Sequence, residues 1–324
     1  MSGFLKKSVL CAGMLFGILS SLCAATVPSV FLQDAGWLWS EQKDGVMTAS
    51  VKLNAGTALD VEVTGEKDSS GAPVAKIKEA AYDGSKGKTL TFAEVKYDGK
   101  TYWVISNRVA LQKKPAVIVE DCAMYNTKSL ADVINAHLDI GSVVAAGNVA
   151  IATGNIDIIE VSYYSERLYA VRTVYVKASK VSSALDDITA FKILDNAAKT
   201  SDLDKKKALL DSADMLNVSS KVKRAVDKAR DDMDASKDML SEGSELYNKA
   251  MTVQTADLSK VNVRNIPGST AGGEVVAQLE SGTLVKAAVK TKKMENIEGL
   301  VAPWIMIMEP VEGWIFGGYA SESE

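Results

Sequence analysis

VNVRNIPG at Val261–Gly268 opens the stretch that decides the fold of this chain. The stretch continues through VVAQLESGTLVKAA (275–288) and APWIMIM (302–308), and it closes with EGWIFGGYAS (312–321). Short runs in which apolar and polar residues alternate are typical of β-strands, and the Asn, Pro and Gly residues between them indicate turns. The stretch therefore predicts a small barrel of short strands.

Two earlier segments repeat this pattern in the same order. KLNAGTALDV surrounds Gly56 and HLDIGSVVAA surrounds Gly141, as LESGTLVKAA surrounds Gly282. In each copy a hydrophobic strand follows, and a further strand with an aromatic residue closes the unit. Self-similarity of this kind predicts one structural unit used three times. The interval between Gly56 and Trp103 is longer than in the other copies, which predicts an enlarged loop or an extra hairpin in the first.

The segment between the second and third copies has a different period. It contains no proline and one glycine, and its residues 222–250 place apolar or small side chains at alternating spacings of four and three. That spacing is a heptad seam, and Ser201 or Asp202 is a candidate N-cap for an earlier helix. We expect two or three helices that pack on one another as a spacer. The alternative is a dimerising coiled coil.

The C-terminal stretch resembles bacterial SH3-like (SH3b) domains. VNVRNIPG corresponds to the opening strand and loop of that family, the turn at Gly282 to its central turn, Trp304 to its tryptophan strand, and Gly313-Trp314 to its closing Gly-Trp step. The first copy departs from the family, because Tyr102 stands where glycine would precede the tryptophan, and the middle copy has no tryptophan. The resemblance implies a binding module for a cell-wall peptide or a protein partner.

The predicted fold class is multidomain and mainly β, with three small SH3-like barrels and an α-helical segment of two or three helices. The predicted divisions are a signal peptide (1–25), a first barrel (27–112), a second barrel (116–182), the helical segment (184–252) and a third barrel (257–321). The four-residue link at 112–115 is short, so the first two barrels should pack side by side.

The N-terminus has the features of an export signal. Lys6 and Lys7 precede an uncharged apolar run from Val9 to Leu22, and small residues follow it. A run this short predicts a secretory signal cleaved after Ala25 rather than a membrane span. The alternative is a lipoprotein signal with Cys23 lipidated. Either processing route predicts a periplasmic or envelope-associated protein with no transmembrane span after signal removal.

The charge balance argues against nucleic acid as a partner. The chain has 37 basic and 41 acidic side chains and a net charge of −4, and signal cleavage would remove two lysines and no acid. A nucleic-acid-binding protein needs clustered positive charge instead.

The residue inventory also argues against catalysis. His137 is the only histidine, which removes most acid–base, nucleophile-activation and metal-ligand schemes. Cys122, in the alternating run VIVEDCAMY, is expected to be a buried small hydrophobe, and His137 an ordinary surface residue. We therefore expect a protein that is not an enzyme and that uses no cofactor and no metal.

Aromatic residues are the remaining candidates for a binding surface. All five tryptophans lie in the two outer copies. The candidates for a ligand groove are Trp314, Tyr319, Trp304 and Trp103. The alternative for Trp304, as for Trp39, is a position in the core. The expected partner is an envelope protein or a peptidoglycan peptide. Two alternatives are a structural protein that forms homo-oligomers through its helices and a regulatory subunit of an envelope enzyme.

Overall fold

The computed structural model describes residues 25–151, 155–269 and 273–323. They form three antiparallel β-sheets and three α-helices, so the chain is mainly β with one helical segment, as predicted. The predicted signal peptide, apart from Ala25, and the alternative lipidation site Cys23 lie outside the described residues.

Each sheet is formed by one continuous segment of the chain, which we call the first, second and third module. The first module contains β1 (Ala25–Phe31), β2 (Gly36–Glu41), β3 (Met47–Leu53), β4 (Thr57–Lys67), β5 (Pro73–Ala75), β6 (Ile77–Ala81), β7 (Thr89–Tyr97), β8 (Lys100–Ile105), η1 (Ser106–Arg108) and β9 (Val109–Leu111). The second contains β10 (Lys114–Ile118), β11 (Cys122–Tyr125), β12 (Val133–Leu138), β13 (Val143–Ile151), β14 (Asp157–Ser165), β15 (Ala170–Lys177), η2 (Ala178–Lys180) and β16 (Val181–Ser182). The third contains β17 (Ser244–Val253), β18 (Val261–Arg264), β19 (Val275–Leu279), β20 (Leu284–Ile297), β21 (Leu300–Glu309), β22 (Gly313–Phe316), η3 (Gly317–Tyr319) and β23 (Ala320–Glu322).

The three modules have the same topology, which confirms the repeat. Their strand orders are β3-β2-β8-β7-β4-β1-β9, β12-β11-β15-β14-β13-β10-β16 and β19-β18-β22-β21-β20-β17-β23. Counted from the start of each module, with β5 and β6 set aside, these orders are identical, and a 3₁₀ helix precedes the last strand each time. Strands β5 and β6 pair with β4 and β7, and they form the extra structure expected in the first copy.

The sheets are open, whereas the sequence predicted barrels. Within the described residues the last strand of each path, β9, β16 or β23, pairs only with the first strand of its module, and no pairing joins the two ends of the path. Each last strand is only two or three residues long, too short to extend across to the opposite edge.

One turn glycine has the same conformation and the same hydrogen bond in all three modules. Gly56, Gly141 and Gly282 have φ of +80°, +86° and +91°, in the left-handed region that glycine adopts without steric cost. The amide of each donates a 2.8 Å hydrogen bond to the last carbonyl of the first strand, from Phe31, Ile118 and Val253 respectively. The glycines on which the sequence repeat depends are therefore structurally equivalent.

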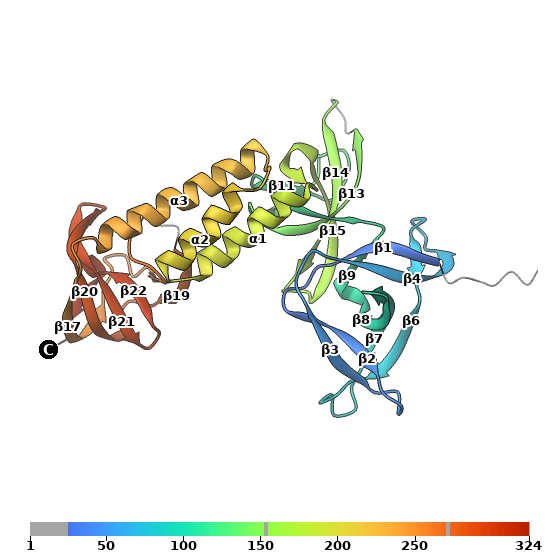
Figure 1. Cartoon of the computed structure of the whole chain (residues 1–324), viewed down its shortest axis with the longest axis horizontal. Helices are drawn as coiled ribbons and strands as arrows, with labels where there is room; N and C mark the ends of the chain where they lie inside the picture. The colour runs from blue at the N-terminus through green and yellow to red at the C-terminus, as the bar shows by residue number, and fades with distance from the viewer. Residues whose placement is uncertain (1–24, 152–154, 270–272, 324) are drawn as a thin grey trace, which may run out of the picture.

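The modules and the helices follow one another in a row (Figure 1). The first and second modules are side by side, as the short link predicts, and their contact includes a small buried cluster of Val30, Leu32, Ala110 and Ala145. The helices lie between the second and third modules, with the third module at the far end. Each module also has a hydrophobic core of its own.

The helical segment is a three-helix unit that packs on itself. It contains α1 (Leu185–Lys199), α2 (Leu203–Asp214) and α3 (Ser220–Leu240). Asp202 caps α2 as expected, because its carboxylate accepts hydrogen bonds from the backbone N–H groups of Asp204 and Lys205 at 3.1 Å. No helix in the described part of the chain is long and apolar enough to cross a bilayer.

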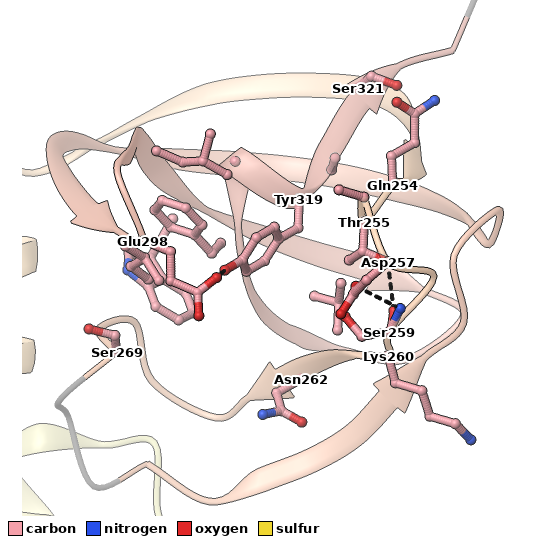
Figure 2. Close-up of a pocket in the computed structure, with 18 of the residues that line it drawn as sticks. Gln254, Thr255, Asp257, Ser259, Lys260, Asn262, Ser269, Glu298, Tyr319 and Ser321 are labelled. Carbon is pink, nitrogen blue, oxygen red and sulfur yellow. Dashed lines mark hydrogen bonds between the residues drawn. The ribbon is translucent and has the colours of Figure 1, made fainter.

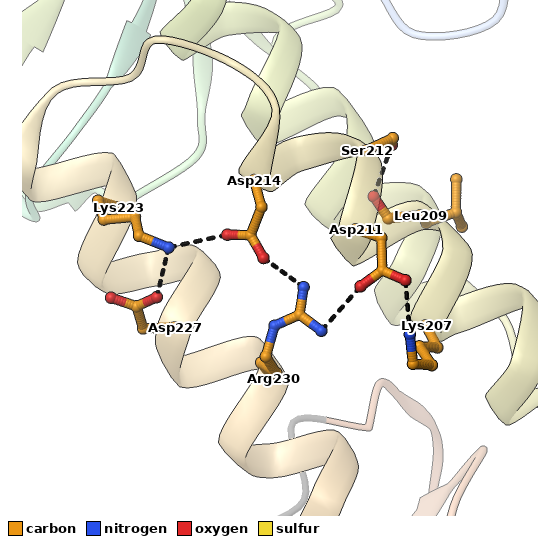
Figure 3. A network of polar contacts seen from close by, with 8 residues as sticks. All are labelled: Lys207, Leu209, Asp211, Ser212, Asp214, Lys223, Asp227 and Arg230. Carbon is orange, nitrogen blue, oxygen red and sulfur yellow. Dashed lines mark hydrogen bonds and ion pairs between the residues drawn. The ribbon is translucent and has the colours of Figure 1, made fainter.

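A polar network joins α2 to α3 (Figure 3). The guanidinium of Arg230 donates to Asp211 at 3.0 Å and also to Asp214. Lys223 lies 2.8 Å from both Asp214 and Asp227. The hydrogen bonds from Lys223 and Arg230 lower the pKa of Asp214, so these contacts strengthen when the carboxylate is ionised.

The heptad interpretation is wrong beyond Leu240. Helix α3 ends there, Gly243 adopts φ of +79°, and its amide donates to the Leu240 carbonyl at 2.9 Å. This is the left-handed glycine that commonly terminates helices. Residues 244–252, expected in the helical segment, instead belong to β17 (Ser244–Val253), which pairs with β20 and β23 near one edge of the third sheet. Seam residues Val222, Val226 and Met233 are buried within the chain.

The shared turn predicts the effect of a single side chain. In Gly282→Ala a Cβ would meet no atom within 4 Å, so the cost is the left-handed backbone alone, about 1–2 kcal/mol. Opening of the third module should become roughly 5- to 30-fold more frequent. Hydrogen-exchange mass spectrometry should show faster exchange than in wild type for peptides from β17 and β20. Peptides from the first module should exchange at the wild-type rate. Gly282→Asn is the control, and it should lose less stability because asparagine tolerates the left-handed conformation. Equal exchange in both variants and wild type would contradict a structural requirement for glycine at this turn.

Candidate functional site

An open groove of about 1000 Å³ lies on the third module (Figure 2). Its sides are the loop that follows β17, the 3₁₀ helix η3, and the turn of the β20–β21 hairpin. All three sides belong to the third module. The groove is thus formed by one repeat unit and does not depend on contacts between modules.

Aromatic rings form the floor and one wall of the groove. Trp304 pairs across the strands with Phe316, and their ring centroids lie 6.0 Å apart in an edge-to-face arrangement. Tyr319 packs on Phe316 in the same way at 5.4 Å. Because side chains alternate along a strand, the neighbours Ile305 and Ile315 point to the module core and the aromatic pair points away from it.

A carboxylate fixes the floor to the adjacent loop. The indole N–H of Trp304 donates to Glu295 at 2.5 Å, and the backbone N–H of Ser269 donates to the same carboxylate at 3.1 Å. Glu295 lies on β20 and Ser269 lies in the loop between β18 and β19. Charge-assisted hydrogen bonds of this kind are stronger than neutral ones, so Glu295 positions both the ring and the loop.

The rim is polar and carries both signs of charge. Hydrogen bonds from Ser259 lower the pKa of Asp257, which stays ionised. Burial and a 3.2 Å hydrogen bond to Glu298 raise the pKa of Tyr319, whose hydroxyl remains protonated and donates to that carboxylate (Figure 2). Lys260 and Arg264 also line the groove. A rim with two carboxylates and two cations over an apolar floor fits a ligand that is itself both charged and apolar.

Two of the four predicted groove residues line the groove, and the other two lie elsewhere. Trp304 and Tyr319 line the groove, and Trp304 is almost fully buried; a role of either residue in ligand binding stays a prediction. Trp314 does not line it; this ring is half-buried beside a cluster that includes Met239 of α3. Trp103 lies in the first module, where Lys78 approaches its ring centroid at 5.6 Å.

The sequence did not identify the polar residues of the groove. Asp257, Glu298 and Glu295 lie in loops or at a strand end, and no local pattern marks them. Only the alternation around Trp304 was a usable signal, because it places that ring on the face opposite the core.

The equivalent surface of the second module is covered by a helix. Lys221, in the first turn of α3, donates to the Ser179 carbonyl of η2 at 2.6 Å and pairs with Glu120 at 2.7 Å. Hydrogen bonds from Lys180 and Lys221 lower the pKa of Glu120 to about 2. The position that is an open groove in the third module is here an internal contact.

In the first module the equivalent 3₁₀ helix contacts the second module. Asn107 donates to the Tyr169 carbonyl at 3.1 Å, and the Arg108 guanidinium lies 4.8 Å from the ring centroid of Tyr164 and donates to its hydroxyl. In the described residues, the hydrogen bonds of η3 in the third module all stay within that module. The first module keeps a smaller cavity of about 200 Å³ at the equivalent place, lined by Trp37, Trp39 and Arg108, so the groove of the third module is the larger of the two.

Cys122 and His137 do not form a catalytic pair. Cys122 pairs across the strands with Leu138, and His137 pairs with Ala123, so the two side chains lie on opposite faces of the sheet. The thiol is buried in the second core, whereas the imidazole is exposed and lies 2.8 Å from Asp139. Burial raises the pKa of the Cys122 thiol to about 11, which keeps it protonated and unreactive. No group of side chains suited to a metal ion occurs within the ranges described.

Comparisons with known proteins were made on both sequence and structure. No family model matches the chain, and no curated protein matches it. Solved structures that align with it include an autolysin candidate from Listeria monocytogenes, at 9% identity and a TM-score of 0.16, covering 91% of this chain and 96% of that one. Two others are NlpC1 and NlpC2 from Trichomonas vaginalis, each at 10% identity, with TM-scores of 0.17 and 0.18. They cover 94% and 92% of this chain, and 96% and 99% of their own. Superposition at this level supports no argument about function.

The cysteine provides a direct test of the second core. In a chain that begins at residue 26, Cys122 is the only thiol. We expect no labelling by iodoacetamide in the folded protein at pH 8 and complete labelling in guanidinium, because the folded thiol ionises only near pH 11. The unfolded thiol ionises near its ordinary pKa, about 8.5. The free energy of unfolding should therefore fall as pH rises between these two values. Stoichiometric labelling of the folded chain at pH 8 would contradict the burial.

Proposed function

We propose that this chain is a non-enzymatic, exported envelope protein whose third module binds a short peptide of the cell wall in the groove beside Tyr319. The observation that carries the proposal is the open groove itself. In the second module α3 contacts the equivalent surface, and in the first module the 3₁₀ helix contacts the second module and leaves a cavity of only about 200 Å³. Of the three copies, the third therefore has the largest groove at this position, and its 3₁₀ helix makes no hydrogen bond to another module in the described residues.

The chemistry of the groove supports a peptide with charges of both signs. Asp257 and Glu298 can accept hydrogen bonds from an amine. Arg264, which donates to the Gly273 carbonyl at 3.0 Å, and Lys260, which lies 2.7 Å from Glu280, can turn to pair with a carboxylate of the ligand. Trp304 and Phe316 offer an apolar floor for aliphatic side chains. Peptides that cross-link cell walls carry free amines, carboxylates and small apolar side chains on one short chain. An extended segment in the groove would meet all three kinds of partner at once.

The second candidate is an assembly protein that associates through its helices. The apolar seam of α3 packs against α1 and α2 in the same chain, so self-association would need another helical surface. A third candidate, a regulatory subunit of an envelope enzyme, would use the same groove for a partner protein instead of a wall peptide. Export in all three cases rests on the N-terminal sequence.

Sedimentation with purified peptidoglycan tests the leading proposal. We expect wild-type protein that lacks residues 1–25 to co-sediment, and Tyr319→Ala to lose roughly tenfold or more in affinity, because the substitution removes a wall of the groove and frees Glu298. Asp257→Asn should weaken binding through loss of charge. Tyr169→Ala is the matched control, since Tyr169 is a well-exposed tyrosine on the second module. Retention that is equal in Tyr319→Ala and wild type, or absent in both, would reject the cell-wall version.

A further inference from the structure

A second cavity lies inside the helical segment, away from the groove. It has a volume of about 470 Å³ and is bounded by α1, by α3 and by the end of the second module next to Val119. Its walls are mainly apolar, with Phe191 and Leu194 from α1 and Ala225 and Ala229 from α3. This size is within the range of small-molecule sites.

A buried lysine from α2 lines this cavity. Lys206 is 2% exposed, and its Nζ has no hydrogen-bond partner within the part of the chain described. Lysine is almost never fully buried unless it is paired, and an unpaired ammonium in an apolar site is costly. Burial lowers the pKa of Lys206, and nearby Asp232 opposes that shift without reaching hydrogen-bond distance.

The charges around the cavity leave a positive excess. Asp232 is engaged by Lys228 at 2.7 Å, and Glu120 is engaged by Lys221 at 2.7 Å and by Lys180. Both acidic side chains that line the cavity therefore have cationic partners already. Lys206, in contrast, is unpaired. Arg224, at the rim, makes no hydrogen bond or ion pair in the described ranges.

We propose that this cavity binds a small amphiphilic monoanion, an apolar body with one carboxylate, and that the Lys206 ammonium, which is buried behind the cavity wall in the free chain, turns into the cavity to pair with the carboxylate. The apolar walls would hold the body, and the ligand would supply the one partner that Lys206 lacks. Arg224 attracts the anion to the rim. A neutral or cationic ligand of the same shape would leave the lysine unpaired and should bind less well. This site is independent of the groove on the third module.

Calorimetry on the chain from residue 26 to residue 324 tests the site with dodecanoate as the probe. We expect one dodecanoate per chain and, for dodecanol, an affinity lower by roughly tenfold or more, since the alcohol has the same body but no charge. Lys206→Met keeps the bulk and removes the charge. It should bind both probes with similar affinity and unfold at a higher temperature, because a buried unpaired charge is gone. Lys205→Met, at an exposed neighbour, is the control and should match wild type.

A second variant keeps the test decisive. Ala229→Leu places a larger side chain in the cavity and should abolish binding of both probes without loss of the folded helices, which circular dichroism can check. The proposal is overturned if wild type binds dodecanoate and dodecanol equally, if Lys206→Met retains full discrimination between them, or if Ala229→Leu binds as wild type does. Absence of any dodecanoate binding to wild type would also overturn it.

Discussion

One backbone hydrogen bond fixes the same turn in each of the three modules. It joins the amide of a left-handed glycine to the last carbonyl of the first strand, and it occurs at Gly56, Gly141 and Gly282 with the same length. The bond fixes where the first strand ends and where the fourth begins, and these two strands are neighbours in every sheet. A second shared bond, from the residue after the first strand to the end of the 3₁₀ helix, places that helix beside the following loop. In the third module these are two sides of the groove.

The three modules share one topology, but the 3₁₀ helix of each module has different neighbours. The residue that ends the 3₁₀ helix has a different contact in each module. Arg108 donates to Tyr164 of the second module, Lys180 pairs with Glu120, which also binds Lys221 of α3, and Tyr319 lines the groove. These residues occupy equivalent positions, so the diversity lies in side chains on a constant backbone. Fold alone therefore does not establish the function of any one copy.

Much of the architecture was predictable from the sequence, because it depends on local signals. Strand alternation, turn glycines and the length of the link between the first two modules identified the repeat, the extra hairpin and the packing of the first pair. The helix limit was missed because SELYNKAMTV, at 244–253, has residues of good helix propensity, while pairing with β20 and β23 makes it a strand. Gly243 was the available signal for the helix end. Of the residues that line the groove, the sequence predicted Trp304 and Tyr319 but not Asp257 and Glu298, since long-range strand pairing brings the loops of these two carboxylates together.

Helix α3 has a mechanical consequence for the third module. It is 21 residues long, which corresponds to roughly 30 Å, and only three residues separate it from β17. Met239 in its last turn packs against Trp304 and Phe316, the underside of the groove floor. The helix is thus a strut anchored at both ends instead of a flexible tether. The helix fixes the distance and orientation of the groove relative to the second module. A ligand in the groove is therefore placed by a rigid helix, whereas a flexible linker would allow many positions.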